Sequence, residues 1–570
     1  MWMTLVLAAS LEVMRFEENL MIPMRDGVRL ATDVYRPARG GTPMDEKLPV
    51  LLQRTPYGKT GSSLVESARY FAANGYVVAL QDVRGTYASE GVFTKYIGEG
   101  EDGFDTVEFL AKLPYANGKV GMWGTSYAAH VQANAAKLRP DALATIVLNM
   151  GGMSNGWDHK VRNHGAFELQ QLTWAFRQLE AETEDPLVKE HLARAPIESW
   201  LEALPLRKGL NPLSVAPNFE DFILEMATHG DYDDDYWKHR DVNWQEHYDE
   251  TLDIPMIHVS GWYDSYAGDV EFGPEAARAD FPREFHLRWF DRFLKGGDDA
   301  AEEPVRVFVM GTGDGHKDEN GRLYHGGRWI TASSWPLPET TGARYYFRGD
   351  GSLSKSPPTE RESASTYTFD PRDPVPTLGG AFSSTSPVFE PGAYHQEERE
   401  GIYGAKPPFL PLSARPDVVV FQTEPLAFDV EVMGPILVEL HASSTALDTD
   451  FTVKLVDVYP PSSDFPSGFE MNLTDGILRA RYRNGPERQQ LMTPGEIYRL
   501  EIEPFPTANV FKRGHRIRVD VSSSNFPRFD VNPNTGEPLG MNRRMQNADN
   551  TLYHDAAHPS HVVLPILERR

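Results

Sequence analysis

The chain has 570 residues, which is more than a single hydrophobic core normally organises, so we expect two to four domains. Its 56 basic and 82 acidic side chains give a net charge of −26. A surface this acidic repels phosphate, so we predict neither nucleic acid nor an anionic membrane as a partner. The absence of cysteine excludes disulfides, thiolate catalysis and cysteine metal sites.

The first ten residues, MWMTLVLAAS, are apolar and resemble the hydrophobic part of a signal peptide, but no basic segment precedes them. We therefore favour a loose N-terminal extension over a signal peptide. No apolar run is long enough to span a bilayer. The compartment stays open, with the cytoplasm favoured.

The first 150 residues alternate between strand-like and helix-like segments. Asp26-Gly27 lies between two strand-like runs and predicts a hairpin over 18–37. Apolar runs predict further strands at 48–53, 76–83, 118–124, 142–150 and 254–260. Helix-like segments such as 65–74 and 101–112 separate them. This alternation is typical of a parallel sheet covered on both faces. We assign 1–150 and 251–335 to two parts of one α/β core.

Residues 151–250 interrupt this alternation with a helical insertion. The predicted helices are HGAFELQQLTWAFRQLEAETE (164–184), PLVKEHLARA (186–195) and ESWLEAL (198–204). A helical cap inserted before the next strand would form a lid over a pocket at the C-terminal edge of the sheet.

Residues 336–570 follow a period of two and are punctuated by proline and glycine. Six strand-like runs stand out: 417–425, 435–443, 451–460, 478–484, 497–505 and 515–524. Short strands in series without helices predict a β-sandwich or jelly roll.

The most informative stretch is GMWGTSYAAH, residues 121–130. A predicted strand ends at Gly124, a small-residue helix follows, and Ser126 lies at the turn between them. This pattern matches the G-x-S-x-G nucleophile elbow, with Ala128 in place of the last glycine. Such a turn exposes the serine hydroxyl and directs the Tyr127 N–H at a developing oxyanion.

Several motifs together resemble one family, the CocE/NonD hydrolases, which include cocaine esterases, X-prolyl dipeptidyl peptidases, glutaryl-cephalosporin acylases and α-amino-acid ester hydrolases. The resemblance covers nearly the whole chain. It implies an α/β-hydrolase core with an inserted helical cap and a C-terminal jelly-roll β domain. The motifs are QRTPYGK (53–59), GMWGTSY (121–127), SGWYD (260–264), MRDGVRLATDVYRP (24–37), DVRGTYASEG (82–91), EGEDGFDTVEFL (99–110) and GHRIRVDVSSSNFPRFD (514–530).

The resemblance also implies roles for particular residues. Ser126 would be the nucleophile, and the Tyr57 hydroxyl would join the Tyr127 N–H in the oxyanion hole. Two donors directed at one developing charge are what acyl transfer requires. Asp264, which follows the fifth predicted strand, would be the acid that orients the catalytic histidine, and the order Ser then Asp fits this fold. We expect an apolar acyl pocket lined by Trp123, Trp174, Trp262 and Tyr127.

The third member of the triad departs from the family pattern. The family would place a helix, a strand and a histidine loop resembling GPWTHG at or near the junction of Tyr266 and Ala267. This sequence instead continues into FPREFHLRWFDRFLKGG, an amphipathic helix. The segment that carries the general base is therefore expected to be missing, and the core is expected to be shortened.

No remaining histidine is a convincing replacement. His286 is interpreted as a residue on the face of the amphipathic helix, His258 as a core residue in a strand, and His130 as pointing away from the elbow. A metal site is not favoured either at the acidic run 231–235 or at the C-terminal histidines His554, His558 and His561, which lack a carboxylate-rich loop.

Two hypotheses follow. The chain is a serine hydrolase that cleaves small-molecule esters or amides through an acyl-serine, as an esterase, an acylase or an X-prolyl dipeptidyl peptidase. Alternatively, it is a catalytically impaired homologue that retains a ligand-binding pocket. A sugar-binding role for the β domain alone is weaker, because it depends on fold analogy. No cofactor is implied, and a homo-oligomer is allowed.

Overall fold

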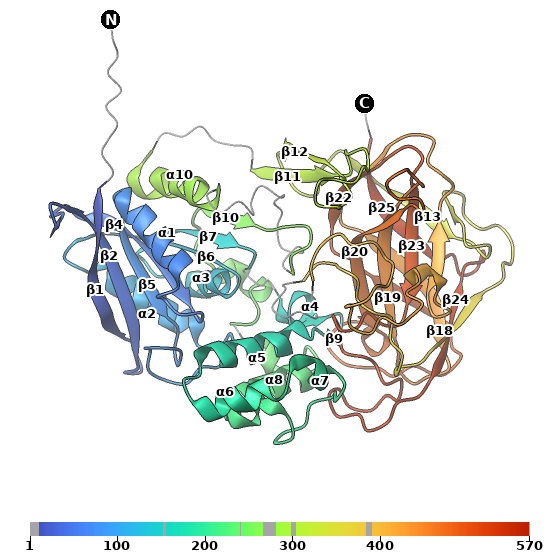
Figure 1. The fold of residues 1–570 in the computed structure, drawn as a ribbon, viewed down its shortest axis with the longest axis horizontal. Helices are drawn as coiled ribbons and strands as arrows, with labels where there is room; N and C mark the ends of the chain where they lie inside the picture. Colours follow the sequence, from blue (N-terminus) through green and yellow to red (C-terminus); the bar gives the residue numbers. More distant parts are fainter. Residues whose placement is uncertain are drawn as a thin grey trace, which may run out of the picture. The chain divides into compact units, whose positions relative to one another are not determined.

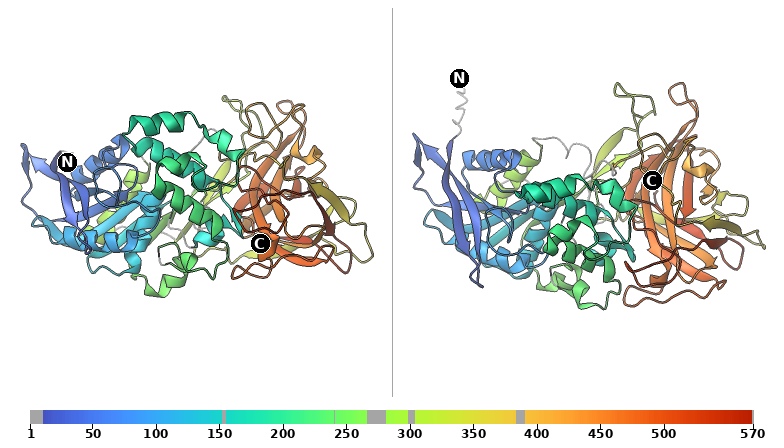
Figure 2. Two further views of the ribbon diagram at one scale, coloured as in Figure 1. Left: turned by 90° about the horizontal axis from the view of Figure 1, so that it is seen from below. Right: turned by 60° about the horizontal axis from the view of Figure 1, so that its bottom comes forward.

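The computed structural model describes residues 11–151, 155–239, 241–265, 281–297, 304–382 and 390–568 (Figures 1 and 2). The chain divides into two compact units. The first unit contains residues 1–154, 239–259 and 274–301, and the second contains 155–238, 260–273 and 302–570.

The first unit is built on a sheet with the order β1-β2-β5-β4-β6-β7-β10 and a short β3 beside β2. Strands β4, β5, β6, β7 and β10 are parallel to one another, and β1 and β2 are antiparallel additions at one edge. The strands are β1 Glu12–Pro23, β2 Arg29–Arg39, β3 Thr42–Pro43, β4 Leu48–Thr55, β5 Val77–Asp82, β6 Ala116–Thr125, β7 Leu143–Asn149 and β10 Met256–Val259.

Helices cover both faces of this sheet, as the near-continuous apolar strands predict (Figure 1). Helices α2 (Glu99–Ala111) and α3 (Tyr127–Lys137) pack on one face with the 3-10 turn η2 (Gln245–Glu250) nearby. Helices α1 (Ser62–Ala73) and α10 (Phe281–Lys295) pack on the other face. The predicted strands and helices of this region are all present.

The predicted hairpin is also present. β1 and β2 pair antiparallel from Pro23↔Arg29 outward, and the turn between them is closed by Met24 N–H to the Val28 carbonyl at 2.8 Å. Gly27 takes a φ of +89°, which glycine adopts without steric cost. The Asp-Gly pair was therefore a correct turn signal.

The second unit contains the helical insertion. Its elements are α4 Gly156–His159, β8 Arg162–Asn163, β9 Ala166–Phe167, α5 Gln170–Glu182, α6 Pro186–Ala193, α7 Ile197–Leu201, η1 Pro212–Val215, α8 Pro217–Thr228 and α9 Asp235–Lys238. The helix predicted from residue 164 begins only at Gln170, so this boundary was wrong. Residues 162–167 instead form a two-stranded turn, in which His164 and Gly165 both take positive φ.

The rest of the second unit is a β domain of two sheets. The larger has the order β12-β11-β22-β17-β25-β18-β24-β15, with β13, β14 and β21 attached, and the smaller has the order β16-β23-β19-β20. The strands are β11 Val305–Met310, β12 Gly327–Ala332, β13 Thr340–Phe347, β14 Leu353–Ser354, β15 Ser365–Phe369, β16 Val419–Gln422, β17 Val430–Gly434, β18 Leu437–Ser444, β19 Asp450–Tyr459, β20 Phe469–Arg479, β21 Tyr498–Ile502, β22 Thr507–Phe511, β23 Arg516–Ser522, β24 Ala548–Tyr553 and β25 His561–Leu567, with 3-10 turns at Leu412–Ala414 and Ala480–Tyr482.

One strand prediction in this domain was wrong. The run 478–484 leaves the sheet at Arg479 and turns into a 3-10 helix at Ala480–Tyr482. The cause is Arg481, whose buried guanidinium must find an acceptor. Its Nε lies 2.8 Å from Asp448 Oδ2, and its amide donates to Asp448 Oδ1 at 2.9 Å, so the chain turns towards that carboxylate.

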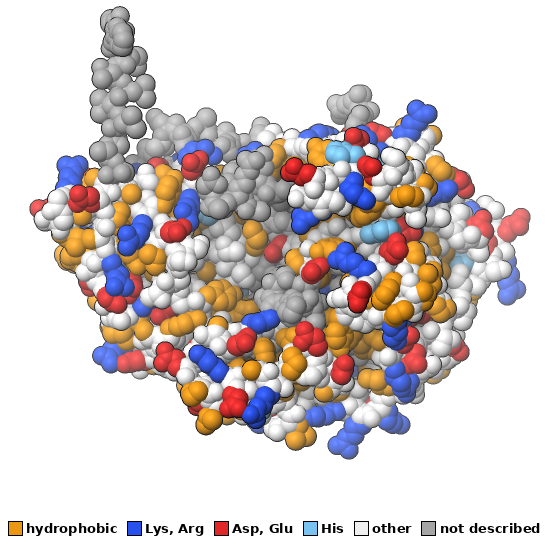
Figure 3. All heavy atoms as spheres, in the orientation of Figure 1, with side chains coloured by type: hydrophobic (Ala, Val, Ile, Leu, Met, Phe, Trp, Pro, Cys, Tyr) orange, Lys and Arg blue, Asp and Glu red, His pale blue; other side chains and the backbone are white. Residues whose placement is uncertain are grey.

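On the face drawn in Figure 3, acidic and basic side chains are interspersed over the described residues. Among the described helices, none combines the length and the apolar character that crossing a bilayer requires.

Helix α10 gives a test of this fold, because it follows the point where the family segment is expected to be missing. Phe290 is fully buried and contacts Phe71 edge-on at 5.9 Å between ring centroids. We expect Phe290→Ala to lower the free energy of unfolding by about 3–5 kcal/mol, because it leaves a cavity in the core. Urea unfolding measures this, with exposed Phe428→Ala as the control. Equal effects of the two variants would contradict this position of α10.

Candidate active site

Ser126 lies between the end of β6 and the start of α3. Its backbone has φ 60° and ψ −119°, a positive φ that a residue with a side chain rarely adopts. The surrounding structure holds it there, since its N–H donates to the carbonyls of Asn149 at 2.9 Å and Met150 at 3.1 Å. A strained serine at a strand-to-helix turn is the geometry of a nucleophile elbow.

Small neighbours make this turn sterically possible. A Cβ on Gly124 would lie 2.5 Å from the Cβ of Ala128, and a Cβ on Gly151 would lie 2.5 Å from the Ser126 carbonyl oxygen. Both distances are shorter than real carbon contacts allow. The motif therefore accepts alanine at position 128 only because position 124 is glycine.

The side chain of Tyr127 faces away from the elbow. It is buried, its hydroxyl donates to Glu99 Oε1 at 2.8 Å and accepts from the Tyr96 N–H at 3.0 Å, and its ring stacks on Tyr96. Glu99 in turn lies 2.9 Å from the guanidinium of Arg54. Tyr127 is thus anchored through a buried carboxylate, and its backbone N–H begins helix α3.

Tyr57 lies on the loop between β4 and α1 and is 42% exposed. Its amide donates to Thr55 Oγ1 at 3.1 Å. The loop borders a cavity of about 520 Å³ that lies entirely within the first unit. The cavity is lined by residues 53, 55, 57, 58, 61–64, 67, 71, 123–125, 149, 283 and 286, so it contains Tyr57, Trp123 and the two residues that precede Ser126.

His286 also lines this cavity. It lies on the face of α10 that packs against the sheet, and its Nε2 donates to Asn149 Oδ1 at 3.1 Å. Burial lowers the pKa of His286 to about 3, so the imidazole is neutral at physiological pH. Its hydrogen-bond partner is a neutral amide, whereas a catalytic histidine is normally oriented by a carboxylate.

His130 and His258 are packed within the first unit, as predicted. His130 lies on α3, where its ring contacts Tyr96 and its Nε2 lies 2.9 Å from Asn134 Nδ2. His258 lies on β10 and stacks on Trp244. Burial lowers the pKa of His130 to about 3, and burial lowers the pKa of His258 to about 4.

Asp264 belongs to the second unit, where its amide donates to the Gly261 carbonyl at 2.9 Å in a tight turn. The two preceding aromatics are anchored in the β domain: Trp262 Nε1 donates to the Phe308 carbonyl, and the Tyr263 hydroxyl donates to the Asn472 carbonyl. The predicted aromatic pocket was therefore wrong for Trp262 and Tyr127, which are held in cores. Trp123 does line the cavity, and Trp174 lies on α5.

The junction near Tyr266 and Ala267, where the histidine loop is expected to be missing, lies outside the described residues. Among the described strands, β10 pairs only with β7.

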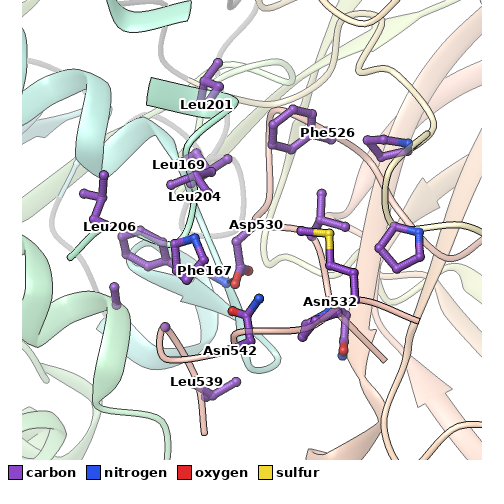
Figure 4. A pocket seen from close by; sticks show the side chains of 18 of the residues that line it. Phe167, Leu169, Leu201, Leu204, Leu206, Phe526, Asp530, Asn532, Leu539 and Asn542 are labelled. Atoms are coloured by element: carbon purple, nitrogen blue, oxygen red, sulfur yellow. Dashed lines mark hydrogen bonds between the residues drawn. The ribbon is translucent and has the colours of Figure 1, made fainter. Parts of the chain in front are cut away.

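A second cavity, of about 540 Å³, lies within the second unit (Figure 4). Leucines from the helical insertion line one side, including Leu169, Leu201 and Leu204, and Phe526 from the β domain lies opposite. The lining cations all have carboxylate partners among the described residues: Arg372 with Asp370, Lys406 with Asp373, Arg479 with Asp450 and Asp530, and Arg481 with Asp448.

Sequence reasoning missed the buried polar groups around the elbow. Glu99 and Arg54 each lie within a family motif, but no neighbouring residue indicates that the two side chains pair. The Asn149–His286 contact was not anticipated either. No local pattern points to such pairs, because their members lie on different elements and meet only in the folded chain.

A serine at a strand-to-helix elbow in a covered parallel sheet defines a serine hydrolase of the α/β class. Residues 26–271 match the X-Pro dipeptidyl-peptidase (S15 family), and residues 299–563 match the X-Pro dipeptidyl-peptidase C-terminal non-catalytic domain. Cocaine esterase of Rhodococcus sp. (strain MB1 Bresler) is 33% identical, over 97% of this chain and 98% of the relative. The chain therefore belongs to this family of serine hydrolases, the CocE/NonD group that its motifs resemble.

Solved structures confirm the fold class, an α/β core with a C-terminal β domain. An aminopeptidase from a marine sediment archaeon, Thaumarchaeota archaeon, superposes with a TM-score of 0.74 at 24% identity, over 98% of this chain and 97% of that one. An α-amino acid ester hydrolase superposes with a TM-score of 0.73 at 24% identity, with the same coverage of both chains.

The alignment of cocaine esterase with this chain contains gaps. The two sequences align over 607 positions, which exceeds the 570 residues of this chain. The relative therefore has residues without a counterpart here. The match to the S15 family ends at residue 271, shortly after the junction where the segment is expected to be missing.

Glu99 gives a pH test of the buried anchor of Tyr127. Burial raises the pKa of Glu99 from 4.5 to about 7, although Arg54 opposes this shift. Between pH 4.5 and 7, the Glu99 carboxyl therefore keeps its proton in the folded state and has lost it in the unfolded state. The stability that this proton contributes is full below pH 4.5 and is lost as the pH rises through 7.

We expect the wild type to lose stability relative to Glu99→Gln between pH 5 and pH 8, by an amount on the order of 3 kcal/mol. Urea unfolding followed by tryptophan fluorescence at several pH values measures this difference. Parallel stability curves for the two proteins would show that Glu99 does not titrate in this range.

Proposed function

We propose that this chain is a serine hydrolase of small-molecule carboxylic esters or amides, with Ser126 as the nucleophile. The observation that carries the proposal is the strained backbone of Ser126 at the turn between β6 and α3. The Ser126 Oγ would attack the substrate carbonyl, its proton would pass to a base and then to the leaving group, and water would hydrolyse the acyl-serine.

The oxyanion of the tetrahedral intermediate needs two donors. We assign these to the backbone N–H of Tyr127, at the N-terminus of α3, and to the hydroxyl of Tyr57. A helix N-terminus favours negative charge, and preorganised donors are usually the largest contribution to acyl transfer. We assign Asp264 as the carboxylate that orients the base.

The base itself limits the expected rate. Burial lowers the pKa of His130, His258 and His286, all in the described part of the first unit, to about 3 or 4. A base so far below neutrality accepts the serine proton poorly. Loss of one triad member typically lowers turnover by about 10⁴–10⁶, which leaves roughly 10³ over water. We therefore expect slow turnover that still depends on Ser126.

The experiment compares p-nitrophenyl acetate hydrolysis by the full chain with Ser126→Ala and with Ser463→Ala, a change at an exposed serine of the second unit that lines neither cavity. We expect Ser126→Ala to abolish the rate above background and Ser463→Ala to retain it. Labelling by a fluorophosphonate should follow the same order. Equal rates and equal labelling of wild type and Ser126→Ala would overturn the proposal.

A second candidate function is ligand binding without turnover, and the cavity in the second unit favours it. Its walls are mainly apolar, and its cations are already paired with carboxylates. An anionic ligand would find no unpaired cation among the described lining residues, and burying an uncompensated charge is costly. The cavity thus fits a neutral, largely apolar molecule better than an anionic one.

A matched pair of probes tests this candidate. We expect 4-phenylbutanamide to bind at least about 10-fold more tightly than 4-phenylbutanoate in isothermal titration calorimetry, because only the acid carries a charge at pH 7. Ala227→Trp should fill the cavity and remove binding, whereas Leu187→Trp, at an exposed position outside it, should not. Equal binding of both probes, or unchanged binding to Ala227→Trp, would refute the assignment.

A further inference from the structure

The loop that carries Tyr57 is fixed near its middle by Lys59. This loop runs from the end of β4 at Thr55 to the start of α1 at Ser62. The Lys59 amide donates to Asp82 Oδ1 at 2.7 Å. This contact lies only two residues beyond the tyrosine whose hydroxyl we assign to the oxyanion hole.

The side chain of Lys59 makes a second attachment. Its Nζ lies 3.3 Å from Asp33 Oδ1 on β2 and 3.5 Å from Asp82 Oδ2 at the end of β5. All three side chains are at least 95% buried. The ammonium thus joins the loop to two neighbouring strands of the sheet.

Asp82 also holds a second loop. Its backbone carbonyl accepts from Ser89 Oγ at 2.7 Å, which ties the segment 83–91 to the end of β5. On this segment Tyr87 has a left-handed φ of 45° and an exposed side chain. A Cβ on Gly58 would lie 3.1 Å from the Tyr87 ring, so this ring covers the backbone directly after Tyr57.

Stability alone does not account for this arrangement. Burying an ammonium between two carboxylates carries a desolvation cost, and apolar replacements of buried ion pairs are often neutral or stabilising. Burial raises the pKa of Asp82, which is a direct sign of that cost. What the ion pairs provide is a fixed position for the loop, because the ammonium has to satisfy two carboxylates on different strands.

We infer that Lys59 and Asp82 are positioning residues, which hold the Tyr57 hydroxyl where the oxyanion develops. The inference deepens the proposed function and depends on its assignment of Tyr57. A donor in an oxyanion hole has to lie about 2.7–3.1 Å from the developing charge. A displacement of about 1 Å can lower the rate by roughly 10²-fold.

The first test does not require activity. Tyr57 is replaced by 3-fluorotyrosine, and its ¹⁹F resonance is recorded in the wild-type background, in Lys59→Met and in Asp82→Asn. We expect one sharp line in the wild-type background and a shifted, broadened line in Lys59→Met. The line in Asp82→Asn should have an intermediate shift and width, because asparagine keeps an acceptor for the Lys59 amide but loses the charge.

The matched control is 3-fluorotyrosine at Tyr324, an exposed tyrosine of the second unit. Its line should be the same in all three backgrounds. An unchanged line at position 57 would overturn the inference, and so would equal broadening at both positions, which would show general loss of structure.

The second test is a double-mutant cycle on ester hydrolysis. We expect Lys59→Met to lower kcat by about 10–100-fold with KM changed less than about threefold, since the donor acts on the transition state. In a Tyr57→Phe background the same change should cost less than about threefold. If the losses in kcat caused by Lys59→Met and by Tyr57→Phe multiply in the double variant, the inference is wrong. Wild-type turnover no faster than that of Ser126→Ala would overturn the proposed function instead, and the fluorine measurement would still decide the position of Tyr57.

Discussion

The backbone strain at Ser126 is the constraint around which the first unit is organised. A serine with φ 60° persists only where neighbouring groups leave it no alternative. Here the carbonyls at the end of β7 accept its N–H, and glycines at positions 124 and 151 leave the space that the turn needs. The parallel sheet supplies the end of β6, and the covering helices fix α3. The elbow is thus a consequence of the packed sheet and does not arise from its five residues alone.

Two buried polar systems lie beside this elbow, one behind each proposed oxyanion donor. Glu99 and Arg54 anchor Tyr127, and Lys59 with its two aspartates anchors the loop of Tyr57. Buried charges are weak contributors to stability, since their desolvation offsets most of their attraction. Their value lies in geometry, because each pairs with charges on other elements of the fold. This explains why a fold with large apolar cores keeps charged groups at these places.

Family membership and present activity are separate questions for this chain. Its fold, its elbow and its similarity to cocaine esterase along nearly the full length place it among serine hydrolases. Yet His130, His258 and His286 are neutral groups with strongly lowered pKa values. Of these three, His286 comes nearest to the required place, since it lines the same cavity as Tyr57, but a neutral amide holds it. The proposed nucleophile and oxyanion donors thus stand in the same unit as three buried histidines that accept a proton poorly.

The sequence by itself determined the parallel sheet, the Asp26-Gly27 hairpin, the β domain and the position of Ser126, because hydrophobic period, turn residues and small-residue spacing are local signals. The tertiary structure decided the rest. The side chain of Tyr127 donates to Glu99 and does not line the expected pocket, and Trp262 packs in the β-domain core. The run 478–484 ends its strand early, where Arg481 pairs with Asp448. Lys59 gained its two aspartates from strands distant in sequence. A buried polar side chain is governed by its partner, and that partner is known only once the chain has folded.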